Sequence, residues 1–559
     1  MTRYAAHVNR RATSQQESAR ADQVQNNAGG FVFALDKWKR LDRFLILGAD
    51  GGTYYVSERE LTIDNANVVL ECLAEDGLRT VRRIVEISDT GRAPRNDPAI
   101  FALAIAAGTG IGVGGYGGTV AAATRKAALE ALPKVCRIGT HLFHFANDVE
   151  GFRGWGPALR KAIAAWYAQR EPRALAYDLV KYQSRDGWGH KDLIKLSHPQ
   201  APTAAHKAAL AWSARGGTEK MGVSTRKKGG GERGTIANRD ALPAIIEAFV
   251  EIHADGVDVR RACELIRAHR LPHECVPNEL KNRPEIWDAL SEHMGLTALM
   301  RNLNKMTAVG LLKPLSDKTH AICSKLIDPN ALFKARVHPL AVLIALKTYS
   351  AGQGALGKLT WIPTSEIVDA LDSAFYLAFE AIEPTNKRHL LGVDCSGSMT
   401  APIARLNLTA REGAAAMAMA TVRAEKRTHV MGFCGQFVSL PITAKQRLDD
   451  VVRTVGQASF GQTDCALPMI YAAEHKLEVD CFSVYTDNET WFGSVHPFQA
   501  LRAYRERMGI PAKLVVVGMA STGFTIADPT DEGMLDVVGF DSAAPAVIAD
   551  FAAEREVCG

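Results

Sequence analysis

The stretch HLLGVDCSGS, residues 389–398, decides the fold of the last third of the chain. Its first five residues are mostly apolar, as in a buried strand, and the strand is expected to end at Asp394. Ser396 and Ser398 follow at two-residue spacing in a glycine-containing turn. A buried strand that runs into a polar turn is typical of a strand–turn–helix unit, so this stretch predicts an α/β domain.

The alternation of short apolar runs and helical segments continues along the chain. Further strands are expected at THVMGF (428–433), CFSVYTD (481–487) and AKLVVVGM (512–519). Helices are expected between the strands, at residues 405–422, 446–455, 466–473 and 497–507. Alternating strands and helices form right-handed crossovers and a doubly wound parallel sheet, which we place within residues 386–559. Ligands of such sheets bind at the carboxyl ends of the strands.

Five oxygen-bearing side chains fall at these strand ends or in a neighbouring loop: Asp394, Ser396, Ser398, Thr463 and Asp487. Two carboxylates and three hydroxyls form a hard oxygen site that suits Mg²⁺ or Mn²⁺, with room for water and one acidic group of a partner protein. The alternative is a serine-rich turn that only caps the following helix. A hydrolytic serine is not supported, because Ser396 lacks the GxSxG context of a nucleophile elbow.

The first 385 residues give a helical signal instead. Apolar residues recur at spacings of three and four in segments that include 125–131, 158–168, 242–254, 259–267 and 341–350. Paired helices of this kind are typical of an α-solenoid, although no fixed-period repeat separates that arrangement from a compact bundle. We expect a flexible polar arm at residues 1–25 and a helical domain at residues 26–385.

Charge divides the chain at the same place. Residues 386–559 carry 16 Lys and Arg against 20 Asp and Glu, a net charge of −4, whereas the first 385 residues carry 50 against 41, a net charge of +9. A basic first part favours a polyanionic partner. Residues 215–239 hold seven Lys and Arg and seven Gly, and they form either a solvated linker or an arm that contacts phosphates.

Several classes of function find no support in the sequence. The ten cysteines form no CxxC pair, and the Cys and His residues within 263–275 have a spacing that fits no common zinc site. The glycine-rich stretch 108–118 contains a GxGxxG match, but it follows a helical segment, unlike a dinucleotide fingerprint. The uncharged stretch 98–124 holds too many glycines for a membrane helix, and no signal peptide is visible, so we expect a cytoplasmic protein.

A basic patch is predicted at residues 181–198, which read KYQSRDGWGHKDLIKLSH. Its basic side chains at helical spacing are Lys181, Arg185, Lys191, Lys195 and His198. The first two are expected on one face of a helix and the last three on one face of a second helix, with a turn at GWG between them. These faces are either solvated or bound to RNA, and Trp188 either packs or stacks on a base.

The basic patch resembles the Ro autoantigen family, the TROVE-domain RNA-binding proteins. The resemblance runs in order from about residue 26 to the end of the chain, and the five oxygen ligands resemble the metal-ion-dependent adhesion site of von Willebrand factor A domains. Other matching segments are GGTYY (51–55), FALAI (101–105), CRIGTHLF (136–143), ALRKAIAAWY (158–167), LTALMRNLNKMT (296–307), VHPLAVLIAL (337–346) and TDNETWFGSVHP (486–497).

The resemblance implies a HEAT-like helical ring closed by a von Willebrand A-type domain. It also implies that Lys181, Arg185 and His198 contact RNA, whereas Lys191 and Lys195 extend this set only by their helical spacing. Family members bind Y RNAs on a basic outer surface and accept single-stranded 3′ ends of misfolded small RNAs in the hole of the ring. Bacterial members cooperate with an exoribonuclease through a Y RNA tether.

Three functional hypotheses follow. The favoured one is a monomeric, non-catalytic RNA-binding scaffold for quality control of noncoding RNA. The second is a metal-dependent protein-binding module of the adhesion or chaperone type, in which the basic face is incidental. The third is an RNA-processing enzyme, and the helical part offers no paired carboxylates, nuclease metal cluster or nucleotide-binding loop in its favour.

Overall fold

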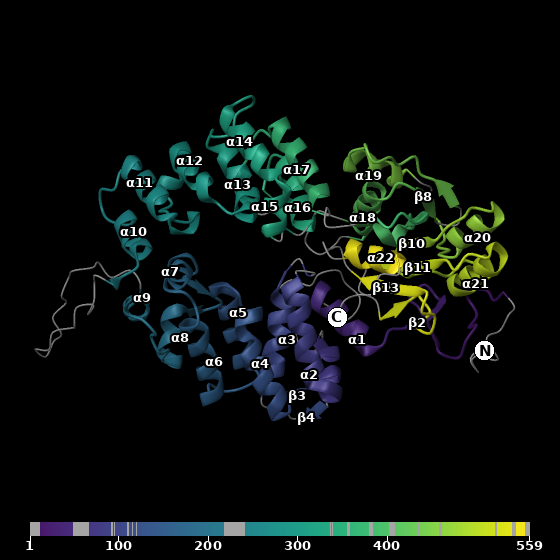
Figure 1. Cartoon of the computed structure of the whole chain (residues 1–559), viewed down its shortest axis with the longest axis horizontal. Helices are drawn as coiled ribbons and strands as arrows, with labels where there is room; N and C mark the ends of the chain where they lie inside the picture. Colours follow the sequence, from purple (N-terminus) through teal and green to yellow (C-terminus); the bar gives the residue numbers. More distant parts are fainter. Residues whose placement is uncertain are drawn as a thin grey trace, which may run out of the picture.

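The fold combines a long helical region with a C-terminal α/β domain. Figure 1 shows that the helices run from α1 to α9 along one side of the molecule and return through α10 to α17 along the other. The computed structural model describes residues 12–48, 66–90, 93, 95–108, 111–113, 116–118, 120–216, 241–335, 337, 339–354, 358–378, 384–401, 409–433, 437–457, 461–519, 523–538 and 544–553.

The helices of the first region follow one another with short connections. In chain order they are α1 (Lys37–Leu47), α2 (Asn67–Thr90), α3 (Asp97–Ala107), α4 (Ala122–Val135), α5 (Gly139–Glu150), α6 (Pro157–Ala168), α7 (Pro172–Lys181), α8 (His190–Ser197), α9 (Ala204–Ala214), α10 (Ala244–Ile252), α11 (Val259–His269), η5 (His273–Cys275), η6 (Leu280–Asn282), α12 (Pro284–His293), α13 (Leu296–Ala308), α14 (Asp317–Leu326), α15 (Pro329–Lys334), α16 (Pro339–Ser350) and α17 (Ser365–Leu377). The segments 125–131, 158–168, 242–254, 259–267 and 341–350, which were expected to be helical, each lie within or over one of them.

Local side-chain chemistry sets several helix ends. The carboxylates of Asp36 and Asp258 and the hydroxyl of Ser316 accept hydrogen bonds from the first backbone N–H groups of α1, α11 and α14. These N–H groups have no partner inside the helix, so each cap removes an unsatisfied donor. Gly48 ends α1 in the left-handed region, with φ of 86°, where a residue without Cβ is favoured.

The uncharged stretch around residue 100 is a core helix. Every residue of α3 from Pro98 to Ala107 is buried, and α3 packs against α1, α2, α4 and α5. This explains its apolar composition without a membrane, and none of the helices in the described ranges has the length and apolarity that a bilayer crossing requires. The expected glycine-rich loop instead contains a short hairpin of β3 (Ile111–Val113) and β4 (Tyr116–Gly118).

The α/β domain has a six-stranded central sheet in the order β13-β11-β10-β7-β8-β9. Its strands are β7 (His389–Asp394), β8 (Thr428–Phe433), β9 (Phe437–Ser439), β10 (Cys481–Thr486), β11 (Lys513–Gly518) and β13 (Met534–Val538). The parallel sheet predicted from the sequence is confirmed from β13 to β8, and β9 adds one antiparallel strand at the edge beside β8. The sheet is therefore mixed, and its other pairings are parallel.

Helices cover both faces of this sheet. Leu391 and Val393 of β7 share a core with α18 (Ala410–Ala424), α19 (Leu448–Gly456) and α22 (Ala544–Ala553). Leu390, one position away, points into a second core with α20 (Leu467–Glu474) and α21 (Pro497–Met508). Since successive side chains of a strand alternate between faces, this double burial confirms the doubly wound arrangement.

The N-terminal segment is part of the α/β domain. Strands β1 (Gln23–Gln25) and β2 (Phe31–Ala34) form a small antiparallel sheet with β12 (Phe524–Thr525), and Val32 and Phe33 lie in the second core. The predicted flexible arm at residues 1–25 is therefore wrong for residues 12–25, and the predicted boundary at residue 26 cuts through a docked segment. Polar composition misled the prediction, because the partners of these polar groups lie more than 400 positions later in the chain.

The helical region meets the α/β domain at both of its ends. At the first end, the guanidinium of Arg43 in α1 donates to both carboxylate oxygens of Asp536 in β13, each at 3.1 Å, and both side chains are buried. At the other end, Asp369 of α17 pairs with Arg447 at 2.6 Å. The path of helices thus closes on the α/β domain, as expected for a ring.

We expect the two ends of the ring to differ in their energetic cost of disruption. Arg43→Ala leaves the Asp536 carboxylate buried without its cation, which costs about 3–5 kcal/mol. Arg447→Ala removes a solvent-screened pair, which costs about 1 kcal/mol or less. Urea unfolding of both variants measures the difference, and equal losses of stability would contradict the ranking.

Candidate cation site and nucleic-acid interface

The sheet brings two of the predicted carboxylates together. Asp394 ends β7 and Asp487 directly follows β10, and these neighbouring strands are parallel, with Val393 opposite Tyr485. Their carboxyl ends therefore lie at the same edge of the sheet. The third loop, which carries Thr463, precedes α20 and is joined to the Asp487 loop because the Thr463 carbonyl accepts the Trp491 and Phe492 N–H groups at 3.1 and 3.2 Å.

Hydrogen-bond contacts link three of the five predicted ligands directly. The Ser396 N–H donates to Asp394 Oδ1 at 2.9 Å, and the Ser396 and Ser398 hydroxyl oxygens lie 3.0 Å apart. The Ser398 side chain also lies beside the Asp487 carboxylate, where it partly offsets the rise that burial causes in the pKa of Asp487. Thr463 is buried and reaches this group through its backbone rather than through a side-chain contact. The structure therefore gathers Asp394, Ser396, Ser398 and Asp487 and holds Thr463 beside their loop.

We call the group of Asp394, Ser396, Ser398, Thr463 and Asp487 the cation cradle. The electrostatics of the cation cradle favour a bound cation. Burial, together with the neighbouring Asp487 carboxylate, raises the pKa of Asp394, and burial also raises the pKa of Asp487. Within the described residues, neither carboxylate forms an ion pair with a basic side chain. Two buried like charges surrounded by hydroxyl oxygens match the donor set of a hard divalent cation, so the residues fit Mg²⁺ or Mn²⁺.

Two further residues shape the cradle. The Thr486 hydroxyl donates to Asp394 Oδ2 at 2.7 Å, and the Arg411 guanidinium donates to the carbonyls of Cys395 and Ser396 at 3.2 and 3.0 Å. Sequence reasoning missed both. Thr486 lies beside Asp487 at the end of the expected strand, and this position could have identified it as a neighbour of the site. Nothing in the sequence pattern indicates the role of Arg411.

The basic residues occupy a different arrangement from the predicted one. Helix α7 ends at Lys181, and Arg185 lies in a short hairpin of β5 (Ser184–Arg185) and β6 (Trp188–Gly189). The prediction that Lys181 and Arg185 share one helix face is therefore wrong. Helical geometry ends at Tyr182, which has φ of −108° and ψ of 82°. The chain then turns at Asp186 and Gly187, which both have positive φ, 52° and 80°, and this turn closes the hairpin that contains Arg185.

The second basic group matches its predicted spacing. Lys191 and Lys195 are exposed on α8, and His198 is exposed as the residue that ends this helix, with φ of 49°. The turn predicted at GWG is the hairpin that leads into α8. Helix α8 packs against α6 and α9.

Lys181 lines a cavity of about 250 Å³ between α7 and the α11–α13 region. Its ammonium lies 3.9 Å from a Glu274 carboxylate oxygen and 5.4 Å from the centre of the Tyr177 ring. Arg270 and His293 also line the cavity, whose apolar wall includes Ile266, Leu271, Leu290 and Leu296. The cavity combines cationic groups, an aromatic ring and an apolar wall, which is the chemistry that contacts an unpaired nucleotide.

An aromatic pair stands beside Arg185. The rings of Trp155 and Trp188 are 5.1 Å apart between centroids, and Arg185 is the cross-strand partner of Trp188. Both indoles are only partly exposed and pack on the core, so packing is the role that the contacts demonstrate for Trp188. The side chain of Arg185 is 53% exposed and is accessible to a phosphate.

Comparison with known proteins gives the class of this chain. Residues 24–348 match the TROVE domain, and residues 388–552 match the Ro60 vWA domain. These two regions coincide with the helical ring and with the α/β domain that bears the cation cradle, so the fold and site define a TROVE–vWA protein.

The relatives are similar over nearly the whole chain. The sequence is 41% identical over 534 residues to the RNA-binding protein RO60 of Deinococcus radiodurans, which covers 95% of each chain. It is 34% identical over 594 residues to RNA-binding protein RO60 of Caenorhabditis elegans, with 97% of this chain and 92% of the relative covered. The crystal structure of the Deinococcus radiodurans Ro protein superposes with a TM-score of 0.69 at 40% identity, over 93% of this chain and 100% of that chain. The chain belongs to the Ro60 family.

Two histidines of the helical region, the buried His190 and the half-buried His141, predict a pH-dependent stability. His190, the first residue of α8, bonds the Tyr167 hydroxyl at 2.9 Å, and burial lowers its pKa to about 3. Burial lowers the pKa of His141 to about 3 as well. The unfolded chain therefore takes up protons below about pH 6.5 that the folded chain refuses, so stability falls as pH decreases from 6.5 toward 3.

We expect each histidine to contribute a slope of up to about 1.4 kcal/mol per pH unit in that window. His190→Gln should reduce the slope of unfolding free energy against pH, because it removes one titrating group. Urea unfolding between pH 4 and pH 7 is the measurement, with His429→Gln, an exposed site, as the control. An unchanged slope in His190→Gln would contradict the assignment.

Proposed function

We propose that this chain is an RNA-binding scaffold for quality control of noncoding RNA, with no catalytic activity of its own. The observation that carries the proposal is the 41% identity, over 95% of both chains, to an RNA-binding protein RO60. A net charge of +9 in the first 385 residues supports it, since phosphate contacts by Lys and Arg dominate affinity for nucleic acids.

The proposed RNA interface has two parts. Arg185, Lys191, Lys195 and His198 form an exposed basic outer surface for the structured part of a Y-like RNA. The cavity beside Lys181 takes an unpaired nucleotide of a single-stranded 3′ end, with its phosphate near Lys181 and Arg270 and its base against Tyr177. A narrow ring excludes duplex, so the clients are misfolded or degrading small RNAs with a free single-stranded end.

The proposed partners follow from these surfaces. A Y-like RNA that extends beyond the basic surface tethers an exoribonuclease in a cytoplasmic complex around one copy of the chain. The cation cradle binds Mg²⁺ or Mn²⁺ through Asp394, Ser396, Ser398, Thr463 and Asp487. Such a metal supplies Lewis acidity toward an incoming carboxylate, so the site takes an acidic group of a protein ligand. Ser398 is exposed and borders the access to it.

A second candidate function is a metal-dependent protein-binding module of the adhesion or chaperone type. The cradle favours it, because two buried carboxylates with hydroxyl neighbours suit cation-mediated docking. In this alternative the basic residues form only a solvated surface of the helical region. Substitutions of these basic residues then leave binding of the protein partner unchanged.

RNA titration tests the favoured function. The probe is a hairpin RNA with a single-stranded 3′ tail, and the readout is affinity across a range of salt concentrations. We expect Lys181→Ala/Arg185→Ala to bind at least tenfold more weakly and to lower the slope of log affinity against log salt by about 1.4 to 1.8, since two phosphate contacts are lost.

The matched control is Lys126→Ala/Arg260→Ala, which removes two positive charges at sites that are 77% and 89% exposed in α4 and α11. This control should keep most of the affinity. Equal losses of RNA affinity in the two double variants would mean that binding depends on overall positive charge rather than on this interface. An absence of RNA affinity in the native protein would refute the RNA-binding proposal.

Metal titration tests the cradle. We expect the native protein to bind Mn²⁺ and Asp394→Ala to lose detectable binding, because the substitution removes one of two carboxylate ligands. At a Mn²⁺ concentration of about 100 times the dissociation constant, the native protein should gain about 2.7 kcal/mol of stability. Asp449→Ala, at an exposed position, is the control. Loss of RNA binding in Asp394→Ala would mean that the cradle also maintains the ring.

A further inference from the structure

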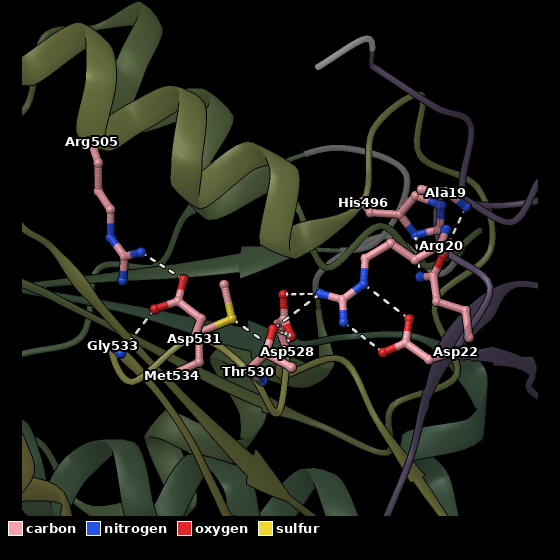
Figure 2. Close-up of polar contacts among 11 residues, drawn as sticks. Ala19, Arg20, Asp22, His496, Arg505, Asp528, Thr530, Asp531, Gly533 and Met534 are labelled. Atoms are coloured by element: carbon pink, nitrogen blue, oxygen red, sulfur yellow. Dashed lines mark hydrogen bonds and ion pairs between the residues drawn. The ribbon is translucent and has the colours of Figure 1, made fainter. Parts of the chain in front are cut away.

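The first described residues of the chain lie along the loops that carry the cation ligands. We define residues 12–30 as the N-terminal strap. Figure 2 shows how Arg20 anchors it: the guanidinium pairs with Asp528 at 2.5 Å and donates to the Thr530 hydroxyl at 3.3 Å. The same guanidinium lies 4.9 Å from the centre of the Phe33 ring. The strap is therefore fixed to the α/β domain independently of the cradle.

Gln15 is the residue of the strap that reaches furthest inward, and its side chain is fully buried. Its amide nitrogen donates to Asp464 Oδ1 at 2.7 Å and to the Val495 carbonyl at 2.8 Å. Its amide oxygen accepts a hydrogen bond from the Thr490 hydroxyl. One buried amide thus joins the loop that contains Thr463 to the loop that begins at Asp487.

The glycine at position 493 leaves room for this contact. A Cβ atom on Gly493 would lie 2.3 Å from the Gln15 amide nitrogen and 2.5 Å from Asp464 Oδ1, which are impossible separations. Gly30 makes a similar close approach, since a Cβ there would lie 2.0 Å from the Thr490 carbonyl oxygen. The strap and the Asp487 loop are therefore fitted to each other at two positions.

The remaining contacts of the strap hold the Asp487 loop in place. The Asn26 amide donates to the carbonyls of Asn488 and Thr490 at 3.3 and 2.8 Å. The Thr490 hydroxyl also accepts a hydrogen bond at 3.1 Å from the N–H group of Cys465, which lies two positions after Thr463. Each of these bonds acts on a residue within three positions of Thr463 or Asp487 rather than on the ligand itself.

We propose that Gln15 is a positioning residue of the cation site, because it fixes Thr463 relative to Asp487 through Asp464 and Thr490. This inference rests on the proposed cation site. Binding of the cation and docking of the strap then stabilise each other, since coupling between two sites is reciprocal. Hydrogen-bonded neighbours of metal ligands commonly change metal affinity by about 10- to 100-fold.

The test compares two glutamines of the same strap in the full-length chain. Gln15→Leu should weaken Mn²⁺ binding at least tenfold by isothermal titration. Gln25→Leu should leave it unchanged, because Gln25 is exposed and its amide donates to the Gly29 carbonyl at 3.0 Å rather than to a ligand loop. Circular dichroism and affinity for the tailed RNA report whether each variant is folded.

A measurement on the native protein covers the case in which Gln15→Leu fails to fold. Mn²⁺ should slow trypsin cleavage after Arg20 in the native protein and should have no effect in Asp394→Ala. The inference is overturned if the native protein binds Mn²⁺ but the ion does not slow trypsin cleavage. It is also overturned if Gln15→Leu binds Mn²⁺ with the same affinity as the native protein. A native protein that binds no Mn²⁺ refutes the cation site itself, which is a distinct result.

Discussion

The buried pair of Arg43 and Asp536 is the constraint on which the ring depends. It joins the first helix to the edge strand of the sheet, at a point where both side chains are almost free of solvent. An edge strand exposes unpaired backbone groups, and α1 covers part of this edge. The opposite end of the helical path is joined by the exposed pair of Asp369 and Arg447, by the half-buried pair of Lys347 and Glu412, and by Arg423 over the Tyr376 ring. The two ends of the ring are therefore held by different kinds of contact.

The arrangement separates two kinds of chemistry. The cation cradle is a product of sheet topology, since adjacent parallel strands deliver Asp394 and Asp487 to one edge. The basic residues stand on helix ends and a hairpin about 200 positions earlier. The two regions belong to different domains, so substitutions in each are expected to affect different ligands.

Sequence reasoning succeeded where the pattern is local. Strands 389–394 and 428–433 matched their predicted bounds, because a buried run followed by a polar turn has a clear signature. It failed where geometry depends on a distant partner. Nothing near residue 15 indicates that its amide is buried against Asp464, and β9 adds an antiparallel edge that no alternation predicts. The expected helix through Arg185 failed for a local reason, because the chain leaves helical geometry at Tyr182 and forms a hairpin.

The strap also has a consequence for biosynthesis. Gln15 bonds a residue 449 positions later, and Arg20 bonds one 508 positions later. These residues leave the ribosome long before their partners are translated. Nascent chains must therefore keep this polar segment unpaired for most of elongation. Closure of the molecule is therefore a late, slow event of high contact order, because it must wait until Asp464 and Asp528 have been translated.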